Sequence, residues 1–564
     1  MSDLKKDIDI AIGKIKAPLV LKNGFIINVF TQSIEKSDIA INKDKIVGIG
    51  NYNGDKEIDC TGLFIAPGFI DAHVHIESSM VTPKVFSQLL LRRGVTTAVA
   101  DPHEIANVLG LSGIEFMLEN SIKSVMDIFF MLPSCVPATE FEDSGAVLGA
   151  EELSKLINHN RVLGLGEVMD TTAVINGKED MLDKLLLFKE SNIDGHCPGI
   201  SQKWLNAYLC SRIKTDHECS KAEEAIKKVQ KGMYVMLREG SATKNLKDLL
   251  PAVNQNNFSR FLFCTDDRHI EDLIEEGTID NSIRLAIRQG LDPIKAYTIA
   301  SYNAAACYGL RDRGAAAPGY KADLVIFEDL NKLNIKHVIK NGESYNKEIS
   351  FSNYKLNNSV MLNLIDKEEF IVQYKSEYIN TIKLIPQSVE TIKQRRKVKS
   401  KDGIVTEIES SDYLKIAVFE RHKKTGKKAV GFVEGFGLKN CSIAQSIAHD
   451  SHNIIVIGDK DEDMALAVNS IIDIQGGIAV VSEGKVLEKL SLPIGGLITS
   501  ENPYDVLKKV KKLNYLARSY GVKKDFDPFL TLGFLALPVI PDLKITARGL
   551  FNYEQFQFID LFSS

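Results

Sequence analysis

The most constraining feature of this chain is a regular alternation of apolar, strand-like segments with amphipathic, helix-like segments over about 240 residues. Between the strand-like segments, apolar residues recur at helical spacing, as in 221–229. Eight strands alternating with helices over this length are typical of a (β/α)8 barrel, although a doubly wound open sheet permits the same pattern. The eight strand-like segments are 66–76, 94–101, 127–132, 162–167, 193–196, 213–217, 233–238 and 261–266.

The placement of polar residues favours the barrel. Several apolar segments end in a histidine or an acid, where a core strand would ordinarily give way to a neutral loop. In an α/β barrel the reactive side chains lie at the carboxyl ends of the strands, so these residues would meet at one rim. A single such histidine is more often a structural hydrogen-bonding group, but four histidines and two acids are hard to explain in that way. The six residues are His73, His75, Glu167, His196, His217 and Asp266.

The first strand carries a His-x-His pair. Side chains alternate between the two faces of a strand, so His73 and His75 project from the same side and can hold one divalent metal. Asp71 shares that face, from which it could orient a ligand imidazole. The pair alone is a weak signal, because His-x-His also occurs by chance on exposed strands.

The six residues suit a pair of metal ions. Two carboxylates neutralise half of the charge of two divalent ions, and a hydroxide shared between ions about 3.5–4 Å apart lowers the remainder. A mixed nitrogen and oxygen donor set suits manganese, iron, zinc or cobalt without choosing among them. We expect Mn²⁺ or Fe²⁺, with Zn²⁺ as an alternative.

Strand signals on both sides of this block predict a small composite domain. They occur before the block, for example at 24–29, and again after it, at 322–327. We therefore expect residues 1–65 and 311–374 to form one β-sandwich domain that flanks a barrel of residues 66–310.

The last third of the chain predicts a third unit. Residues 453–458 have the pattern of a strand, 462–468 that of a helix, and 475–481 that of a glycine-rich turn leading into a strand. We assign 375–564 to a separate C-terminal α/β domain. Its basic run at 393–399 is better explained by a solvated strand edge than by a nucleic-acid site.

Composition excludes several classes of protein. The 564 residues carry a formal net charge of −5, which gives no electrostatic reason to expect nucleic acid or an anionic membrane as a partner. No apolar run approaches the roughly 20 residues that span a bilayer, and the N-terminus lacks the apolar segment of a signal peptide. Eight cysteines without a Cys-x-x-Cys pair suggest reduced thiols. We expect a soluble cytoplasmic protein.

Several strings of residues resemble known families. The first-strand motif, the downstream acids and histidines, and the segments 300–305 and 319–325 resemble the amidohydrolase superfamily. Further strings resemble the bacterial adenine deaminase family, and this likeness spans nearly the whole chain. These strings are 75–80, 100–107, 164–169, 194–199, 265–269 and 461–467.

The fourth strand separates branches of the superfamily. Dihydroorotase-like and hydantoinase-like members place a lysine there, which is carboxylated to bridge two metals. This chain has Glu167, which needs no modification and fits the adenine deaminase pattern. Cytosine and adenosine deaminases also resemble the superfamily but characteristically work with one metal.

The resemblance implies roles for the six residues. One metal would lie on His73, His75 and Asp266, another on His196 and His217, and Glu167 would bridge them. A metal-bound hydroxide would attack C6 of adenine. Asp266 would take the proton of the hydroxide and pass it to the departing amine, so that hypoxanthine and ammonia leave.

Other polar residues near the predicted rim are candidates for substrate contact. His103 and Glu104 follow the second strand and are candidates for purine contact or an accessory metal, with a loop-capping pair as an equal alternative. Residues after strands seven and eight could contact the ring or brace the loops, and a solvated loop is the favoured alternative for those after strand seven. Those candidates are Arg238, Glu239, Ser241, Asp267, Arg268 and His269. Ser78 and Glu77 have no assignable role.

We therefore expect an enzyme of purine salvage that deaminates free adenine and forms a homo-oligomer, a dimer or higher. A cyclic amidase or deacetylase with the same barrel is the alternative within enzymes, and it would release a carboxylic acid instead of ammonia. A non-catalytic assembly protein would typically have lost metal positions, and none is missing here. A nucleic-acid-editing deaminase is disfavoured, because its zinc arrangement combines His-x-Glu with Pro-Cys-x-x-Cys and this chain has no Pro-Cys-x-x-Cys segment.

Overall fold

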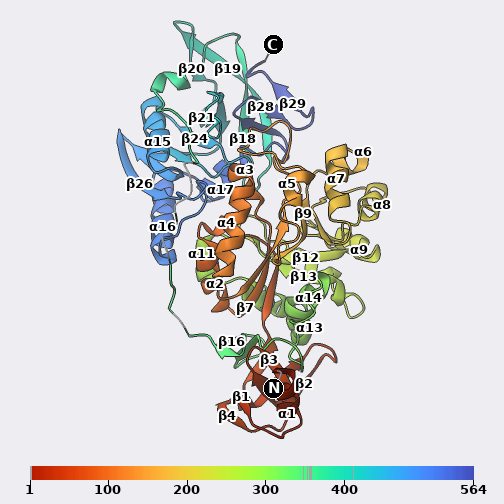
Figure 1. The fold of residues 1–564 in the computed structure, drawn as a ribbon. Coiled ribbons are helices and arrows are strands. Elements are labelled where there is room, and N and C mark those ends of the chain that lie inside the picture. Colours follow the sequence, from red (N-terminus) through yellow and green to blue (C-terminus); the bar gives the residue numbers. More distant parts are fainter. Residues whose placement is uncertain (1–2, 347, 352–353, 355–358, 411, 564) are drawn as a thin grey trace.

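A computed structural model describes residues 3–346, 348–351, 354, 359–410 and 412–563. The N-terminus lies in a small β unit at one end of the molecule, and the C-terminus lies at the opposite end (Figure 1). An α/β body with helices around it lies between the two ends. None of the helices in the described ranges is both long enough and apolar enough to cross a membrane.

The small β unit is built from both sides of the central block. In the described part of the chain, an eight-stranded sheet has the order β17-β16-β15-β5-β1-β2-β3, with β4 paired to β1. An N-terminal helix, α1 (Asp3–Ala11), precedes the sheet. The strands are β1 (Ala17–Asn28), β2 (Ser33–Asn42), β3 (Lys45–Gly50), β4 (Gly54–Asp59), β5 (Phe64–Pro67), β15 (Leu324–Phe327), β16 (Ile335–Lys340) and β17 (Glu343–Ser344).

The described strands form one hydrogen-bonded sheet that bends back on itself, because Ile46 of β3 lies in the same buried cluster as Ile326 of β15 and Ile339 of β16. The long strand β1 takes part in this bend. Its first half pairs in parallel with β4 and its second half pairs in parallel with β5, while β2 runs antiparallel along its other edge. The strand β1 therefore connects the part of the sheet that contains β4 to the part that contains β5, and the register shift between Leu21 and Gly24 lets β1 bend.

The predicted strands of the central body are present. Most agree with the predicted ranges to within two residues. A six-stranded sheet has the order β10-β9-β8-β7-β6-β14 and a three-stranded sheet the order β11-β12-β13, both within the described ranges. The strands are β6 (Phe69–His75), β7 (Val95–Ala100), β8 (Asp127–Leu132), β9 (Val162–Val168), β10 (Asn192–Gly195), β11 (Thr215–Asp216), β12 (Tyr234–Arg238), β13 (Phe261–Cys264) and β14 (Asp266–Asp267).

The first and last predicted strands are each divided. Residues 66–76 divide at Gly68 into β5, in the small sheet, and β6, in the central sheet. A Cβ at Gly68 would lie 2.2 Å from Oγ1 of Thr96, so only glycine fits this crossing. Residues 261–266 divide at Thr265, so that β13 pairs with β12 while β14 pairs in parallel with β6.

The two central sheets approach each other on both sides. The Lys214 amide donates to the Ile193 carbonyl (3.2 Å) and so bridges β10 to the segment before β11. On the other side, β13 contacts β6 and the chain crosses into β14. The strands β6 and β7 are buried along their whole length, as expected for parallel strands covered by helices.

Helices follow the strands of the central body along the chain. They are α2 (Pro83–Leu91), α3 (His103–Leu109), α4 (Leu111–Ile122), α5 (Ala150–Ser154), α6 (Thr171–Asn176), α7 (Glu179–Leu187), α8 (Gln202–Cys210), α9 (Ala222–Gln230), α10 (Leu246–Leu249), α11 (Ile270–Glu275), α12 (Ile279–Arg288), α13 (Pro293–Thr298), a π-helical turn (Ile299–Asn303) and α14 (Ala304–Cys307).

The C-terminal part has its own sheets. Within the described residues, a ten-stranded sheet has the order β20-β19-β18-β22-β21-β24-β23-β25-β26 with β30 paired to β18, and β27, β28 and β29 form a three-stranded sheet. Helices α15 (Asp461–Asp473) and α16 (Pro503–Ser519) contact β25 and β26 of the large sheet, and α17 (Pro528–Phe534) contacts β24. The strands are β18 (Tyr378–Leu384), β19 (Thr391–Lys401), β20 (Ile404–Ile408), β21 (Tyr413–Phe419), β22 (Lys428–Glu434), β23 (Ser442–Gln445), β24 (Ile454–Gly458), β25 (Gly477–Ser482), β26 (Lys485–Ser491), β27 (Leu543–Thr546), β28 (Gly549–Asn552), β29 (Gln557–Ile559) and β30 (Phe562–Ser563).

A cluster of charges joins the small sheet to the central body. Oδ2 of Asp127, at the start of β8, accepts from Arg313 (2.8 Å), Lys321 (3.1 Å) and Lys340 of β16 (2.9 Å). Burial acts to raise the pKa of Asp127, but the three cations outweigh it and hold the pKa well below its usual range.

Replacing Asp127 with Asn is expected to lower the free energy of unfolding by about 3 kcal/mol, because three cations lose the carboxylate that they share. Arg313 and Lys340 keep a second carboxylate each, in Asp312 and Asp323. The folded-state pKa is depressed, so this stabilisation is complete above the unfolded-state value of about 3.9 and is lost as the pH falls through the folded-state value. Urea unfolding of the full chain measures both effects. The control is Asp473→Asn, which removes an exposed pair with Lys489 and should change little. Equal stability of the two variants would contradict the role of Asp127.

Candidate metal centre

The six predicted ligand residues lie at the carboxyl ends of the central strands. Two come from β6, where alternation places His73 and His75 on one face. Glu167 lies near the end of β9, and Asp266 begins β14. His196 follows β10 and His217 follows β11. All are buried except His196, whose side chain is 27% exposed.

The two carboxylate oxygens of Glu167 face different imidazoles. Oε1 lies 3.3 Å from Nε2 of His75 and 4.0 Å from Nε2 of His73. Oε2 lies 2.7 Å from Nδ1 of His196 and 3.1 Å from Nε2 of His217. One carboxylate therefore stands between two pairs of imidazoles, which is the position that a bridging ligand requires.

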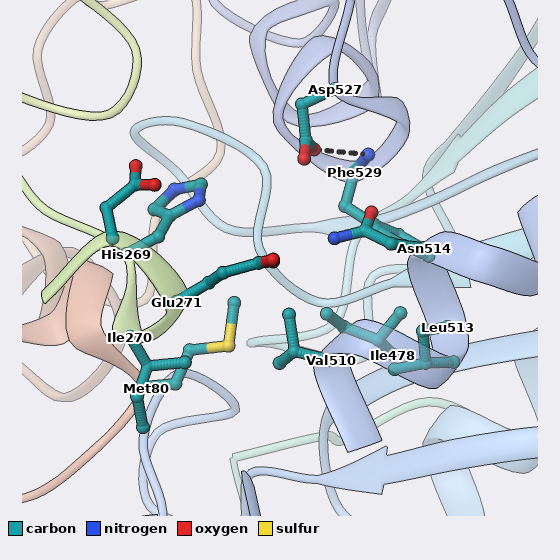
Figure 2. Close-up of a pocket in the computed structure, with 11 residues that line it drawn as sticks. Met80, His269, Ile270, Glu271, Ile478, Val510, Leu513, Asn514, Asp527 and Phe529 are labelled. Atoms are coloured by element: carbon teal, nitrogen blue, oxygen red, sulfur yellow. Dashed lines mark hydrogen bonds between the residues drawn. The ribbon is translucent and has the colours of Figure 1, made fainter. Parts of the chain in front are cut away.

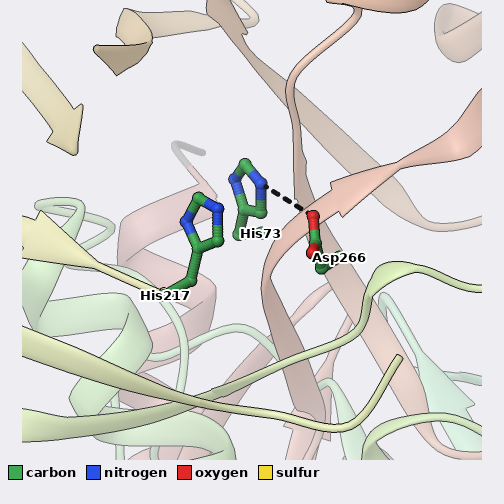
Figure 3. Close-up of side chains that lie close together, drawn as sticks. All are labelled: His73, His217 and Asp266. Atoms are coloured by element: carbon green, nitrogen blue, oxygen red, sulfur yellow. Dashed lines mark ion pairs between the residues drawn. The ribbon is translucent and has the colours of Figure 1, made fainter. Parts of the chain in front are cut away.

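Asp266 closes the other side of the cluster. Its Oδ1 lies 3.0 Å from Nε2 of His75 and 3.5 Å from Nε2 of His73. Figure 3 shows Asp266 directed at His73, with His217 on the other side of that ring. The rings of His73 and His217 are stacked with centroids 4.2 Å apart. The strands thus bring residues nearly 200 positions apart in sequence into contact.

The donor set fits divalent metal ions. The carbonyl of Asp101 can only accept a hydrogen bond, so Nδ1 of His75 donates to it (2.9 Å) and Nε2 of His75 keeps its lone pair for a metal. Three residues that each offer one ligand atom within 4.8 Å of the others form overlapping groups: His73 with His75 and Glu167, Glu167 with His196 and His217, and His73 with His217 and Asp266. Nitrogen and oxygen donors in this mixture suit manganese, iron, zinc or cobalt.

Both acids of the cluster are ionised at neutral pH. Burial acts to raise the pKa of Glu167, but hydrogen bonds from His196 and His217 outweigh it and hold the pKa well below its usual range. Burial likewise opposes ionisation of Asp266, but the charge of Arg238 and the hydrogen bond from His73 outweigh it and hold the pKa of Asp266 well below its usual range.

Asp266 has an unusual backbone conformation that its neighbours fix. Its φ is 56°, in the left-handed region that non-glycine residues rarely adopt. The residue before it, Thr265, donates its amide (3.1 Å) and its hydroxyl (2.5 Å) to the carboxylate of Asp71. Asp71 therefore holds the turn that presents Asp266, and does not act through the ligand-imidazole contact suggested by its place on the strand.

Arg238 supports Asp266 from the opposite side. Its Nη1 donates to Oδ2 of Asp266 (2.7 Å) and also contacts Glu218. Arg238, predicted as a substrate contact, is thus buried in an ion-pair network beside the cluster. Glu218 was missed by the sequence analysis, although its position directly after His217 is a usable signal.

Asp101 is a second residue that sequence reasoning missed. Besides the carbonyl contact with His75, its Oδ2 accepts from the amide of Glu167 (3.0 Å). Asp101 therefore links two predicted ligand residues through its backbone and its side chain. Its place at the end of the second predicted strand was the available signal.

His103 lies next to the cluster. Its Nδ1 is 3.4 Å from Oε1 of Glu167 and 3.7 Å from Oδ1 of Asp101. Among the described residues, neither this Nδ1 nor this Oδ1 has a hydrogen-bond partner. Its neighbour Glu104 points instead to two histidines of the C-terminal part.

The remaining candidates brace the loops after β12 and β14. Arg268 is fully buried and donates to the carbonyls of Glu239, Gly240 and Gly277. Asp267 accepts from the hydroxyl of Ser78 (2.5 Å), which gives Ser78 a partner. Arg268 thus has the bracing role that the sequence analysis allowed for it.

His269 lines a cavity between the central body and the C-terminal part (Figure 2). Its amide donates to the hydroxyl of Ser241 (2.9 Å). Glu271 and Asp272 of α11 line the same cavity, and Glu271 is directed toward Asn514 of α16. Of the described residues that line it, none belongs to the six-residue cluster.

Two family models match this chain. The model of the amidohydrolase family matches residues 64–344, and the model of the adenine deaminase C-terminal domain matches residues 388–557. Full-length relatives match as well. An adenine deaminase of Clostridium acetobutylicum is 46% identical over 567 residues, 99% of this chain and 100% of the relative. This chain belongs to the adenine deaminase family.

Other relatives in the adenine deaminase family have the same extent. Adenine deaminase 2 of Carboxydothermus hydrogenoformans is 46% identical over 566 residues, and an adenine deaminase of Geobacillus kaustophilus is 46% identical over 571 residues. Each alignment covers 99% of this chain and 99% of the relative. The resemblance seen in the sequence is confirmed, and the C-terminal part belongs to it.

Two solved structures that match this chain each cover 58% of it. The atrazine chlorohydrolase of Arthrobacter aurescens, complexed with zinc, has a TM-score of 0.44 at 15% sequence identity and covers 58% of this chain and 94% of that chain. The dihydropyrimidinase of Brevibacillus agri has a TM-score of 0.44 at 14% identity with the same coverage.

Replacing Glu167 with Gln is expected to lower the amount of Mn²⁺ bound, because the carboxylate between the two imidazole pairs loses its charge. Elemental analysis of protein dialysed against Mn²⁺ measures the effect. The control is Glu179→Gln on the exposed first turn of α7, which should bind as the parent does. Metal content equal to that of the parent in the Glu167 variant would contradict the bridging position.

Proposed function

We propose that this chain is an enzyme that hydrolyses adenine to hypoxanthine and ammonia, as part of purine salvage. The observation that carries the proposal is the 46% identity to adenine deaminases over the full chain, joined to a buried cluster of four imidazoles and two carboxylates. A cyclic amidase or deacetylase is less well supported, because the fourth strand carries Glu167 in place of a lysine.

The centre is proposed to hold two divalent ions, Mn²⁺ or Fe²⁺, with Zn²⁺ compatible. His73, His75 and Asp266 would hold one ion, His196 and His217 the other, and Glu167 would lie between them. When bound, such ions supply Lewis acidity that makes water a nucleophile near neutral pH. The rest of the chemistry belongs to the protein's own side chains.

Asp266 is the proposed proton carrier. Its carboxylate is ionised, is fixed by Arg238 at Oδ2, and presents Oδ1 to the cluster. It accepts a proton from the attacking water as oxygen bonds to C6, and returns that proton to the exocyclic nitrogen as the C6–N bond breaks. The other hydrogen of the water passes from the new oxygen substituent to N1 of the ring, so that water and adenine become hypoxanthine and ammonia, and Asp266 ends as it began.

The architecture supports a rim site of this kind. We propose that the two central sheets are parts of one closed (β/α)8 barrel of residues 66–310, flanked by a β domain of residues 1–65 and 311–374 and followed by a C-terminal α/β domain of residues 375–564. The contacts of β10 with β11 and of β13 with β6 support closure. A cytoplasmic homo-oligomer, a dimer or higher, that acts on a free base without nucleic acid or membrane is part of the same proposal.

Incubation of Mn²⁺-loaded protein with adenine is expected to release ammonia and hypoxanthine in equal amounts. Adenosine and cytosine, tested in parallel, should release far less, and chelator treatment should abolish the reaction until Mn²⁺ is returned. Coupled ammonia detection and chromatography of the purine follow both products. Ammonia from cytosine but not from adenine would contradict the assignment.

Replacing Asp266 with Asn is expected to reduce kcat on the order of 10²–10⁴-fold, because the amide cannot accept a proton. The variant should keep the circular dichroism spectrum of the parent. Asp312→Asn, at an exposed carboxylate that pairs with the buried Arg313, is the matched control and should retain activity. Turnover like that of the parent in the Asp266 variant would contradict its role as proton carrier.

A further inference from the structure

A second group of titratable side chains lies between the central body and the C-terminal part, and we refer to Glu104, His449 and His452 as the Glu104 clamp. Oε1 of Glu104 lies 2.8 Å from Nδ1 of His449, and its Oε2 contacts Nε2 of His452. All three side chains are buried. Glu104 belongs to α3, whereas both histidines lie in the loop between β23 and β24.

Hydrogen bonds and ring stacking outside the clamp hold that loop in place. The buried guanidinium of Arg421 donates to the carbonyls of His452, Ser359 and Gly495. Nε2 of His422 lies 2.7 Å from the carbonyl of Ser451. The ring of His449 stacks on Phe534 of α17 with centroids 4.7 Å apart. Contacts other than those with Glu104 therefore hold both imidazoles of the clamp in position.

The hydrogen bonds define the state of the clamp. The amide of Ala448 donates to Nδ1 of His452 (3.2 Å), so the proton of this imidazole is on Nε2 and is directed to Glu104. The lone pair that a metal would need at Nε2 is therefore not available. At the other oxygen, His449 faces Glu104 as a charged donor, because Glu104 outweighs the effect of burial and raises the pKa of His449 to about 9.

Glu104 connects this clamp to the cluster through His103. Oε1 of Glu104, which faces His449, is also 3.6 Å from Nε2 of His103. The opposite nitrogen of His103 faces Glu167 at 3.4 Å, and its ring lies 4.5 Å from that of His75, centroid to centroid. His449, Glu104 and His103 thus form a chain of contacts that begins in the C-terminal domain. It ends at two predicted metal ligands, Glu167 and His75.

We infer that the C-terminal domain completes the active site, with His449 and His452 as positioning residues that fix Glu104 and, through it, His103 against Glu167 and His75. The inference deepens the proposed function, on which its kinetic part rests. It gives the C-terminal domain a role in the reaction, and it makes the clamp a hydrogen-bonded support instead of an accessory metal site.

The test compares variants that remove a donor with variants that keep one. His449→Ala and His452→Ala remove the contacts. His449→Asn and His452→Gln keep a nitrogen near the position of Nδ1 and Nε2, respectively. His337→Ala, at an exposed histidine of β16, is the control. Each full-length protein is loaded with Mn²⁺ and measured for kcat and KM on adenine, for the number of ions bound, and for Mn²⁺ affinity by chelator competition.

The alanine variants are expected to lose about 10–100-fold in kcat/KM and to bind Mn²⁺ more weakly, as is typical when a partner of a ligand is removed. The number of ions bound should stay that of the parent, and the Asn and Gln variants should recover most of the loss. Loss of an ion in His449→Ala or His452→Ala would overturn the inference in favour of an accessory metal site. Activity and affinity like those of the parent in both alanine variants would also overturn it.

A double-mutant cycle tests whether the histidines act through Glu104. The double variant Glu104→Gln/His452→Ala should lose no more kcat/KM and Mn²⁺ affinity than Glu104→Gln alone. Losses that add in the double variant would contradict the clamp. If the alanine variants do not fold, Glu104→Gln carries the same expectations for affinity and ion number. Mn²⁺ affinity is measured without substrate, so the two proposals can fail separately. If the parent does not deaminate adenine but the alanine variants bind Mn²⁺ more weakly than the parent, the proposed function is rejected and the clamp is kept.

Discussion

The structure depends on the burial of one carboxylate, that of Glu167, between four imidazoles. A buried acid without compensation would be neutral, and the fold prevents this by directing histidines from three other strands at its two oxygens. The parallel strands of the central body achieve this because their carboxyl ends meet, so that short segments with little pairing of their own, such as β11, still deliver a residue to the centre. Much of the local sequence serves that convergence.

The position of the six residues could be predicted because it follows from two simple rules. Alternation along β6 sets His73 and His75 on one face, and strand ends set Glu167 and Asp266 near them. What supports them could not be predicted in this way. The contacts of Asp71 with Thr265, and of Arg238 with Asp266, depend on which strands become neighbours and on the break before β14. A strand pattern contains no information on either.

The small sheet shows a similar limit. Its strands were visible in the sequence, but their arrangement depends on how far β1 continues past its register shift, and this is a property of pairing rather than of any single strand. The histidines at 449 and 452 were invisible for a different reason. Nothing in their own segment marks them, and their meaning comes only from Glu104, some 345 residues earlier.

The contacts of the C-terminal part with the central body are numerous and specific. Arg548 donates to Asp143 and to two carbonyls nearby, and Phe141 packs among aromatic rings of β28 and β29. Together with His449 and His452, which contact Glu104, these interactions join the central body and the C-terminal part into one functional unit. The consequence concerns modularity: a domain boundary drawn through the chain between them would not separate a catalyst from an accessory. Exchange of the C-terminal part between distant homologues would succeed only where the residues on both sides of this interface come from the same protein.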